Sequence, residues 1–469
     1  MRAKLNFIAR ILLGPAVFFI IQEINFPGLA FEGKTVLALY GWIVSWWMLV
    51  PVPWAVTSLL PLLILPFCGM LDLNTAAGLY GQKIFFFLLG VLSFGIAAEK
   101  HGLAKRIALI FLSKAWVCRS LNRILFAYML SVAVISAFID DAAAIALCLP
   151  VGLSVWRYTK EKTEMEEKQA KRLNVFIVLG TLYAAEAGGI MTVAGIPHIA
   201  ITISVMEKTA GIGLNFLEWS KIGIVIGITS LLLYYLILYI FFRPKAVITE
   251  SFHEYFIQKK ESSGRLNRAE VSTLCILSLM LILWILPIFV ETKLNIWNVP
   301  VIAMIMLYLL PAAKGGKESI VSADDFKTRM PWNILFLILG GSVLADLTVM
   351  FGLIEWIQGF VPADFSGLGI SVLTGFGTAV LSNFVSGTAS VNIVGNIVFP
   401  IAKSAGLNPK ALAYLLPASG MAIMFPWAGA ATGTTFSLGG VSIKDMLKSG
   451  FAATVLHILS VIAITEIML

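Results

Sequence analysis

The sequence has little charge for its length. Only 13% of its 469 residues are charged while 59% are hydrophobic, and the mean hydropathy is +0.91. In soluble domains about a quarter of the residues are charged. The shortage of charged residues here extends along the whole chain. Soluble catalysis and nucleic-acid binding are therefore poor hypotheses. The composition predicts an all-α, polytopic membrane protein whose surroundings are a lipid bilayer.

Cysteine and histidine are also scarce. The four cysteines have no CxxC or metal-ligand spacing, and we interpret them as packing residues: Cys68, Cys118, Cys148 and Cys275. There are four histidines and no HExxH motif. A membrane enzyme that uses a metal is therefore the least favoured of the functions that we consider.

Long apolar runs are what the sequence has instead. A helix that crosses a core of about 30 Å needs about 20 apolar residues. Clear candidates are residues 7–24, 35–50, 54–71, 84–99, 217–242, 269–290, 297–312, 333–350 and 449–468. The first follows Arg2 and Lys4 as a signal peptide would, but no small-residue cleavage site precedes the next run, so we expect a retained helix. About eleven transmembrane helices are predicted in all.

Two further apolar stretches, 123–156 and 369–405, are too long for one crossing and short for two. Basic residues flank the first on both sides: Lys100, Lys105, Arg106, Lys114, Arg119 and Arg123, then Arg157, Lys160, Lys162, Lys171 and Arg172. No Lys or Arg occurs between Arg329 and Lys403, around the second. Because cytoplasmic segments are rich in Lys and Arg, we predict two re-entrant hairpins, the first entering from the cytoplasm and the second from the outer face.

Each hairpin is followed by an apolar segment that glycine and proline interrupt. The segment 174–206 is interrupted at Gly188-Gly189 and at Gly195–His198, and the segment 411–438 at Pro426–Gly433. A hairpin and a broken helix that occur twice, from opposite sides, are typical of an inverted-repeat secondary transporter with its site near the middle of the membrane. Close helix packing through glycine is the alternative interpretation.

The predicted organisation has four parts. These are N-terminal scaffold helices (1–71), a first repeat (72–242), a cytoplasmic linker (243–268) and a second, inverted repeat (269–469). The charge pattern predicts a cell-membrane protein with its N-terminus in the cytoplasm. Basic and apolar residues alternate at helical spacing from Lys100 to Arg119, which predicts an interfacial helix with a weaker counterpart at Lys327–Trp332.

Short strings in both halves match those of one known family. They are Phe86–Gly90 with Ala97–Leu103, Met330–Trp332 through Gly341 with Gly352–Trp356, and Gly406–Pro409 after the second hairpin. Together with the order of hairpins and breaks, they resemble the divalent anion:sodium symporter family, which carries dicarboxylates, citrate or sulfate. The resemblance covers nearly the whole chain beyond about residue 70. It implies alternating access, a homodimer, no enzymatic activity and no cofactor beyond bound sodium ions.

In that family a Ser-Asn-Thr triplet at each hairpin tip binds the substrate carboxylates and, with carbonyls of the adjacent breaks, two sodium ions. The first triplet falls here on Asp140-Asp141-Ala142 and the second on Ser386-Gly387-Thr388. A threonine and double-proline element of the second break is replaced by Ala428–Ala431. The resemblance thus implies substrate contacts at Ser386, Gly387, Thr388, Asp141, Ala142, Gly429 and Ala430.

The first half of the implied site departs most from the family, because it gains acids. Glu186 stands where a small hydroxyl residue is usual, and His198 where asparagine is common. Bare charges are costly inside a membrane, so a bound cation or protons must neutralise these carboxyls. We assign cation or proton coupling to Asp140, Asp141, Glu186, Gly188, Gly189 and His198.

Structural roles stay open for the same residues. Either aspartate of the first tip can cap the following helix, Glu186 can pair with Lys83, His198 can be a neutral core residue, and Asp346 can pair or act. The favoured function is transport of a small divalent organic anion, dicarboxylate-like, coupled to sodium or protons. A cation/proton antiporter that uses the two aspartates and Glu186 is the alternative.

Overall fold

The protein is helical throughout the part that the structure describes. This computed structural model describes residues 2–163, 165–245, 251–359 and 367–469, which form helices and connections with one isolated β-bridge, Pro311 to Ser319. The predicted all-α fold is confirmed. Six of the described helices are long and apolar enough to cross a membrane, and four shorter apolar helices of 10–17 residues accompany them.

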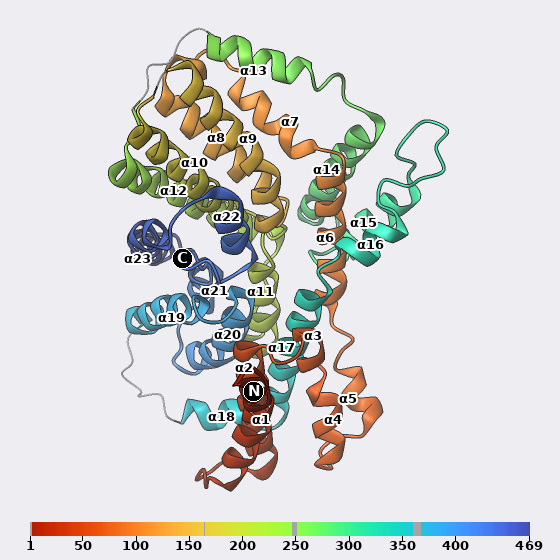
Figure 1. Ribbon diagram of the computed structural model, residues 1–469. Coiled ribbons are helices and arrows are strands. Elements are labelled where there is room, and N and C mark those ends of the chain that lie inside the picture. Colours follow the sequence, from red (N-terminus) through yellow and green to blue (C-terminus); the bar gives the residue numbers. More distant parts are fainter. Residues whose placement is uncertain (1, 164, 246–250, 360–366) are drawn as a thin grey trace.

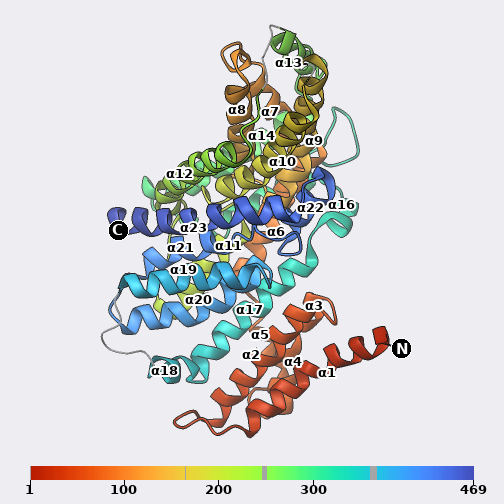
Figure 2. The ribbon, with the colours of Figure 1, turned by 60° about the vertical axis from the view of Figure 1, so that its left-hand side comes forward.

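The N-terminal helices form a group at one end of the molecule (Figure 1 and Figure 2). They are α1 (Arg2–Glu23), α2 (Phe31–Leu49), α3 (Trp54–Thr57), α4 (Leu60–Phe67) and α5 (Leu73–Gly78). Helix α1 packs along α2. The predicted single span 54–71 is wrong, because two short helices occupy it. Pro61 lies in the first turn of α4, where its missing N–H costs least.

The first half of the remaining chain contains the predicted hairpin and broken helix. Its helices are α6 (Lys83–Lys100), α7 (Leu103–Leu112), η1 (Val117–Arg119), α8 (Leu121–Ser136), α9 (Asp141–Lys162), α10 (Glu167–Gly189), α11 (Pro197–Ala210) and α12 (Phe216–Phe242). Helices α8 and α9 are the two arms on either side of residues 137–140. Residues 190–196 separate α10 from α11, so Gly188 and Gly189 end the first helix instead of lying in the break.

The second half repeats this order. Its helices are α17 (Trp332–Met350), α18 (Leu353–Gln358), α19 (Gly367–Ser382), α20 (Gly387–Ser404), α21 (Pro409–Ser419), α22 (Ala430–Gly439) and α23 (Ile443–Met468). Residues 383–386 join the arms α19 and α20. The break between α21 and α22 covers residues 420–429, so it starts before the predicted Pro426 and ends before Gly433.

A left-handed glycine follows the first long helix of each half. Gly102 (φ 74°) precedes α7, and Gly352 (φ 69°) precedes α18; a side chain would be strained in this conformation. By position, α18 therefore corresponds to α7. The predicted counterpart at Lys327–Trp332 is wrong, because that segment ends one helix and begins another. Likewise, Lys100–Arg119 is divided among the end of α6, α7 and η1.

Four helices and a short turn connect the two halves. They are α13 (Ser251–Glu261), α14 (Arg268–Ile285), η2 (Leu286–Ile288), α15 (Val299–Leu309) and α16 (Ala323–Arg329). Residues 246–250 of the predicted linker lie outside the described residues. Helix α15 packs closely on α6: a Cβ on Gly90 would lie 2.3 Å from the Pro300 carbonyl. With 11 residues, α15 is about 16 Å long, shorter than the predicted span.

The two halves interlock at the centre of the molecule. Helix α11 of the first half packs on α20 and α21 of the second, and α9 packs on α22. In both views the breaks and hairpins of the two halves lie side by side (Figure 1 and Figure 2). Hairpin tips and helix breaks far apart in sequence therefore meet in one place.

Ion pairs hold the C-terminal end of α11 to α6 and α17. Lys83 Nζ lies 2.6 Å from Glu207 Oε1, and Lys208 Nζ lies 2.8 Å from Asp346 Oδ1. Gln82 Nε2 also donates to Asp346, at 2.8 Å. Asp346 thus has a pairing role, and Lys83 pairs with Glu207, not with Glu186.

A second ion-pair group secures the start of α16. Asp325 accepts hydrogen bonds from Lys100 Nζ at 2.6 Å and from the Ser322 backbone N–H at 2.8 Å, and Arg329 Nε lies 3.2 Å away. Burial opposes ionisation of the Asp325 carboxyl, but the hydrogen bonds from Lys100 and Ser322 outweigh it and lower its pKa to about 2.

We expect Asp325→Asn to destabilise the fold at pH 7 by about 1–3 kcal/mol, since it removes charge-assisted hydrogen bonds. A carboxyl with a lowered folded-state pKa stabilises the fold above its ordinary pKa of 3.8 and loses this contribution as pH falls toward about 2. Thermal melts in detergent at pH 7, 5 and 3 measure the difference, which should shrink below pH 4. An equal loss in the neighbouring Asp324→Asn variant would contradict the assignment.

Candidate functional site

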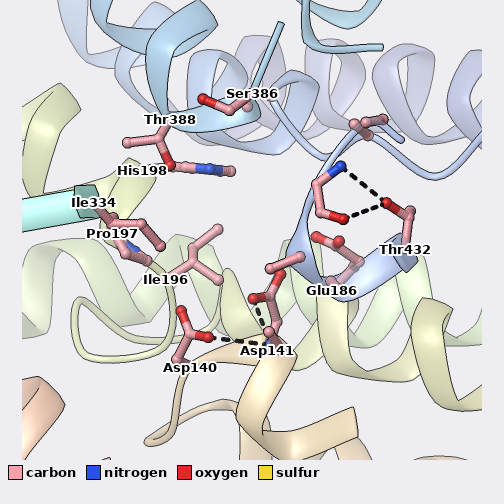
Figure 3. A pocket seen from close by; sticks show the side chains of 18 of the residues that line it. Asp140, Asp141, Glu186, Ile196, Pro197, His198, Ile334, Ser386, Thr388 and Thr432 are labelled. Atoms are coloured by element: carbon pink, nitrogen blue, oxygen red, sulfur yellow. Dashed lines mark hydrogen bonds between the residues drawn. The ribbon is translucent and has the colours of Figure 1, made fainter. Parts of the chain in front are cut away.

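The hairpin tips and helix breaks surround a cavity of about 140 Å³. Each of the four contributes a short run of lining residues: 140–142 and 386–388 from the tips, 196–198 and 428–432 from the breaks. Glu186 from α10 and Gly420 and Ala422 from the second break complete this part of the wall. Figure 3 shows their side chains directed toward a common space.

Nearly all of the residues singled out from the sequence line this cavity. They are Asp140, Asp141, Ala142, Glu186, His198, Ser386, Gly387, Thr388, Gly429 and Ala430. Gly188 and Gly189 do not. A Cβ on Gly188 would lie 2.1 Å from the Ala133 carbonyl of α8, and one on Gly189 would lie 2.6 Å from Ile196 Cγ2. Both glycines thus permit close packing of the end of α10.

Four of the described helices begin at the cavity. They are α9 at Asp141, α11 at Pro197, α20 at Gly387 and α22 at Ala430. The first backbone N–H groups of a helix have no partner within it, and the aligned peptide dipoles place about half a positive charge at this end. Four such ends around one cavity favour a negatively charged occupant.

Carboxyl groups occupy one side of the cavity. Asp140 Oδ1 and Asp141 Oδ1 both accept a hydrogen bond from the Ala142 backbone N–H, at 3.1 and 2.7 Å. Asp140 is the N-cap of α9, which confirms the capping alternative for this residue. Each aspartate has a second carboxyl oxygen that this N–H does not use. Each aspartate therefore keeps one carboxyl oxygen for another interaction besides capping.

Glu186 is the most buried of the three acids. Its side chain is buried in α10, only 3% exposed, and its carboxyl is within hydrogen-bonding reach of that of Asp141, with which it can share a proton. Two carboxylates in contact at low dielectric repel strongly, so a proton or a cation must lie between them. Among the described residues, no lysine or arginine lines the cavity to serve as that cation.

Hydroxyl groups occupy the opposite side. Ser386 is the N-cap of α20 and accepts from the Ala389 N–H at 3.2 Å, which leaves its O–H free to donate. Thr388, the second residue of α20, lines the cavity from the first turn of that helix. This side supplies hydrogen-bond donors next to a helix N-terminus. Thr432 is not on this side: it belongs to α22, which packs on α9 and α10, and it lies beside Glu186 (Figure 3), where its hydroxyl accepts from the Gly429 N–H at 3.0 Å and donates to the Gly429 carbonyl at 3.0 Å.

His198 lies with the hydroxyl side and not with the acids (Figure 3). A Cβ on Gly387 would be 2.8 Å from His198 Cε1 and 2.2 Å from the Gly420 carbonyl oxygen. The imidazole also lies against the Pro417 backbone carbonyl. The imidazole therefore fills the space beside the second tip, where the glycine leaves room for it.

Several lining residues were not foreseen from the sequence. Trp54 of α3 and Ile334 and Leu337 of α17 form an apolar part of the wall, and Thr432 contributes from the first turn of α22. The string from Pro426 to Gly433 includes Thr432, so that residue could have been found. The apolar residues carry no local signal, because only packing of distant helices brings them to the site.

We expect Gly387→Ala to destabilise the protein by about 1–3 kcal/mol, because the added methyl group would overlap the Gly420 carbonyl oxygen. Thermal melting of the purified variant measures the loss. Gly377→Ala in α19 is the matched control, since a Cβ there meets open space and alanine is the better helix former. Equal stability of the two variants would contradict the close approach at the second tip.

Comparison with known proteins agrees with this architecture. The sequence model described as the sodium:sulfate symporter transmembrane region matches residues 5–468. The sodium-dependent dicarboxylate transporter SdcS of Staphylococcus saprophyticus is 27% identical, over 97% of this chain and 90% of its own. The protein of the same name from Staphylococcus aureus strain USA300 is also 27% identical, over 97% and 89%. The chain therefore belongs to the divalent anion:sodium symporter family, a family of membrane transporters.

Proposed function

We propose that this protein is a secondary active transporter that moves small divalent organic anions, dicarboxylates first among them, with sodium ions or protons. The observation that carries the proposal is the convergence of four helix N-termini on one cavity at the centre of a membrane protein. Such ends bind carboxylates through their free N–H groups. Two relatives named as sodium-dependent dicarboxylate transporters support it, since they align over nearly the whole chain.

The substrate carboxylate is proposed to bind at the start of α20. Ser386 and Thr388 donate their hydroxyl hydrogens, and the backbone N–H groups that follow Gly387 add to the positive end of the helix. Ala142, Gly429 and Ala430 lie at the starts of α9 and α22, where their small side chains leave room for a second carboxylate. The Ala142 and Gly429 N–H groups already donate to the two aspartates and to Thr432, so this carboxylate would have to bind other N–H groups of the same helix starts.

The coupling cation is proposed to act at the acidic side. Asp140, Asp141 and Glu186 repel a dianion while they are ionised, so binding of the anion follows their neutralisation by sodium or protons. This order couples the two movements, because the anion binds well only to the loaded carrier. Gly188 and Gly189 contribute by bringing the end of α10 close to the first tip.

Alternating access requires the cavity to open to one side of the membrane at a time. The apolar wall formed by Trp54, Ile334 and Leu337 comes from helices other than the tips and breaks that carry the polar groups. Movement of the tips and breaks along this wall would transfer the site between the two faces. By resemblance, we also propose a homodimer in the cell membrane with the N-terminus in the cytoplasm.

A cation/proton antiporter is the second candidate. It is favoured by one observation, the contact of the Asp141 and Glu186 carboxyls in a cavity that no described lysine or arginine lines. Such a pair can exchange a proton for a metal cation without any anion. The two candidates differ in whether Ser386 and Thr388 matter for transport.

Uptake of radiolabelled succinate into proteoliposomes tests the proposal, with sodium and pH gradients imposed separately. We expect accumulation driven by at least one gradient, because the acidic side must be neutralised from the side of higher cation concentration. Protein-free vesicles are the control for leakage, and liposomes without internal succinate are the control for the exchange assay. Absence of uptake under both gradients and under succinate exchange would contradict anion transport and favour the antiporter.

We expect Thr388→Ala to weaken succinate binding about 10- to 100-fold, since it removes a charge-assisted hydrogen bond worth about 1.5–3 kcal/mol. The matched control is Ser404→Ala, at the other end of the same helix, whose hydroxyl bonds only the Ile401 carbonyl. Isothermal titration of purified protein measures both affinities. If both variants bind succinate like the wild type, Thr388 does not contact the substrate.

Asp141→Asn should leave a carrier that still binds succinate but whose dependence on sodium or pH is altered, because one of the two touching carboxyls can no longer ionise. Initial rates measured across sodium concentration and pH show the change. An antiporter gives the opposite pattern: Asp141→Asn abolishes ion exchange, while Thr388→Ala has little effect on it.

A further inference from the structure

A second cavity lies outside the central site, between α7 and the start of α14. Its volume is about 620 Å³, larger than that of the central cavity. Apolar side chains form much of its wall: Leu103, Ile107 and Ile110 from α7, Leu274 from α14 and Leu266 from the connection before α14. Ile110 is 47% exposed and Leu266 is 49% exposed. An open apolar groove of this kind is typical of a site that an apolar partner covers.

The groove crosses the depth at which a bilayer changes from headgroups to hydrocarbon. Helix α14 begins at Arg268 and belongs to an apolar span whose most apolar stretch is only 22% buried within the protein. Val271 and Ile282 of this helix are exposed, so they face lipid. Because charged side chains avoid the hydrocarbon, Arg268 marks its edge. Leu274 lines the groove from the second turn, inside that edge, and residues 260–266 line it from outside.

Arg106 of α7 holds the groove in shape. Its side chain pairs with Glu270 of α14 and donates to the backbone carbonyls of Ser263, Gly264 and Arg265, at 2.7, 2.8 and 3.1 Å. Helix α7 also packs on α13 at the end of the molecule opposite the N-terminal helices (Figure 1). The groove is therefore formed before a ligand arrives, which lowers the entropy that binding costs.

Unpaired basic side chains stand at the polar end of the groove. Lys260 and Arg265 line it and are exposed, and neither is ion-paired with a carboxylate in the described part of the chain. Glu261 also lines the groove, but residues 259–268 contain four basic side chains and only this one acid. A basic cluster next to a membrane-spanning helix attracts anionic lipid headgroups.

We propose that this groove binds an anionic phospholipid of the surrounding membrane. The phosphate lies between Lys260 and Arg265, and an acyl chain follows Ile107, Ile110 and Leu274 into the hydrocarbon. A soluble anion would leave the apolar wall uncovered, and a zwitterionic lipid would leave the positive charge uncompensated. The inference is independent of the proposed function, because it concerns a surface outside the central cavity.

Native mass spectrometry of the delipidated protein in detergent tests the inference. The probes are dioleoylphosphatidylglycerol and dioleoylphosphatidylcholine, which have the same acyl chains but differ in net charge. We expect the first phosphatidylglycerol to bind about tenfold more tightly than phosphatidylcholine, because two unpaired cations attract its headgroup. Equal affinities would overturn the inference. Glycerol phosphate has the anionic group without the chains, so its displacing the lipid at equal concentration would show a site for soluble anions and also overturn it.

The double change Lys260→Gln with Arg265→Gln locates the headgroup. It should reduce the preference for phosphatidylglycerol at least fivefold. The matched control is Arg157→Gln with Lys162→Gln in α9, which removes the same charge from exposed positions that do not line the groove. An unchanged preference in the first double variant, or an equal loss in the control, would overturn the placement of the lipid in this groove.

Ile110→Gln tests the path of the acyl chain and does not depend on the basic residues. The affinity for phosphatidylglycerol should fall about threefold to tenfold, since an apolar contact of the chain is lost. The matched control is Ile224→Gln in α12, at another exposed position. Thermal melting of each variant shows that it is folded. Equal affinities of the two variants would contradict an acyl chain along α7.

Discussion

Backbone N–H groups without a partner, held at the centre of a membrane protein, are the constraint on which the rest of the structure depends. Helices α9, α11, α20 and α22 all begin at one cavity, where there is little bulk water to satisfy their first N–H groups. Side-chain caps satisfy only some of them. An anion can satisfy several at once, which is the reason for proposing that the two hairpins and two broken helices form a binding site.

The carboxyls opposite modify what this anion site can hold. In other members of the family, as the resemblance implies, neutral side chains occupy the first hairpin tip, whereas here Asp140 and Asp141 stand there and Glu186 lies behind them. The cavity keeps its positive helix ends but gains three acids that no described lysine or arginine offsets. On the proposed function, a positive group enters with the anion, as a proton or a sodium ion.

Much of the architecture could be predicted from sequence because membrane depth constrains length and charge so strongly. The hairpins α8–α9 and α19–α20 could be located because each stretch is too long for one crossing and has a polar middle. Basic residues flank the first stretch and are missing around the second. The resemblance to the family then located the tips at Asp140 and Ser386. Tertiary contacts could not be predicted in the same way. Gly188 and Gly189 belong to α10 and fit closely against Ala133 of α8 and against Ile196. His198 turns to the second tip, and Trp54 reaches the cavity from a distant helix. Nor could the sequence tell that Lys83 pairs with Glu207 across 124 positions.

The anion is proposed to bind only after the acidic side has been neutralised. Succinate affinity of the purified protein, measured by isothermal titration over a grid of sodium concentration and pH, tests it most directly. The account predicts that binding strengthens as sodium is added or pH is lowered, and that it is lost when sodium is absent at high pH. Affinity that is independent of both would contradict it, because the ionised carboxyls would then pose no barrier to a dianion.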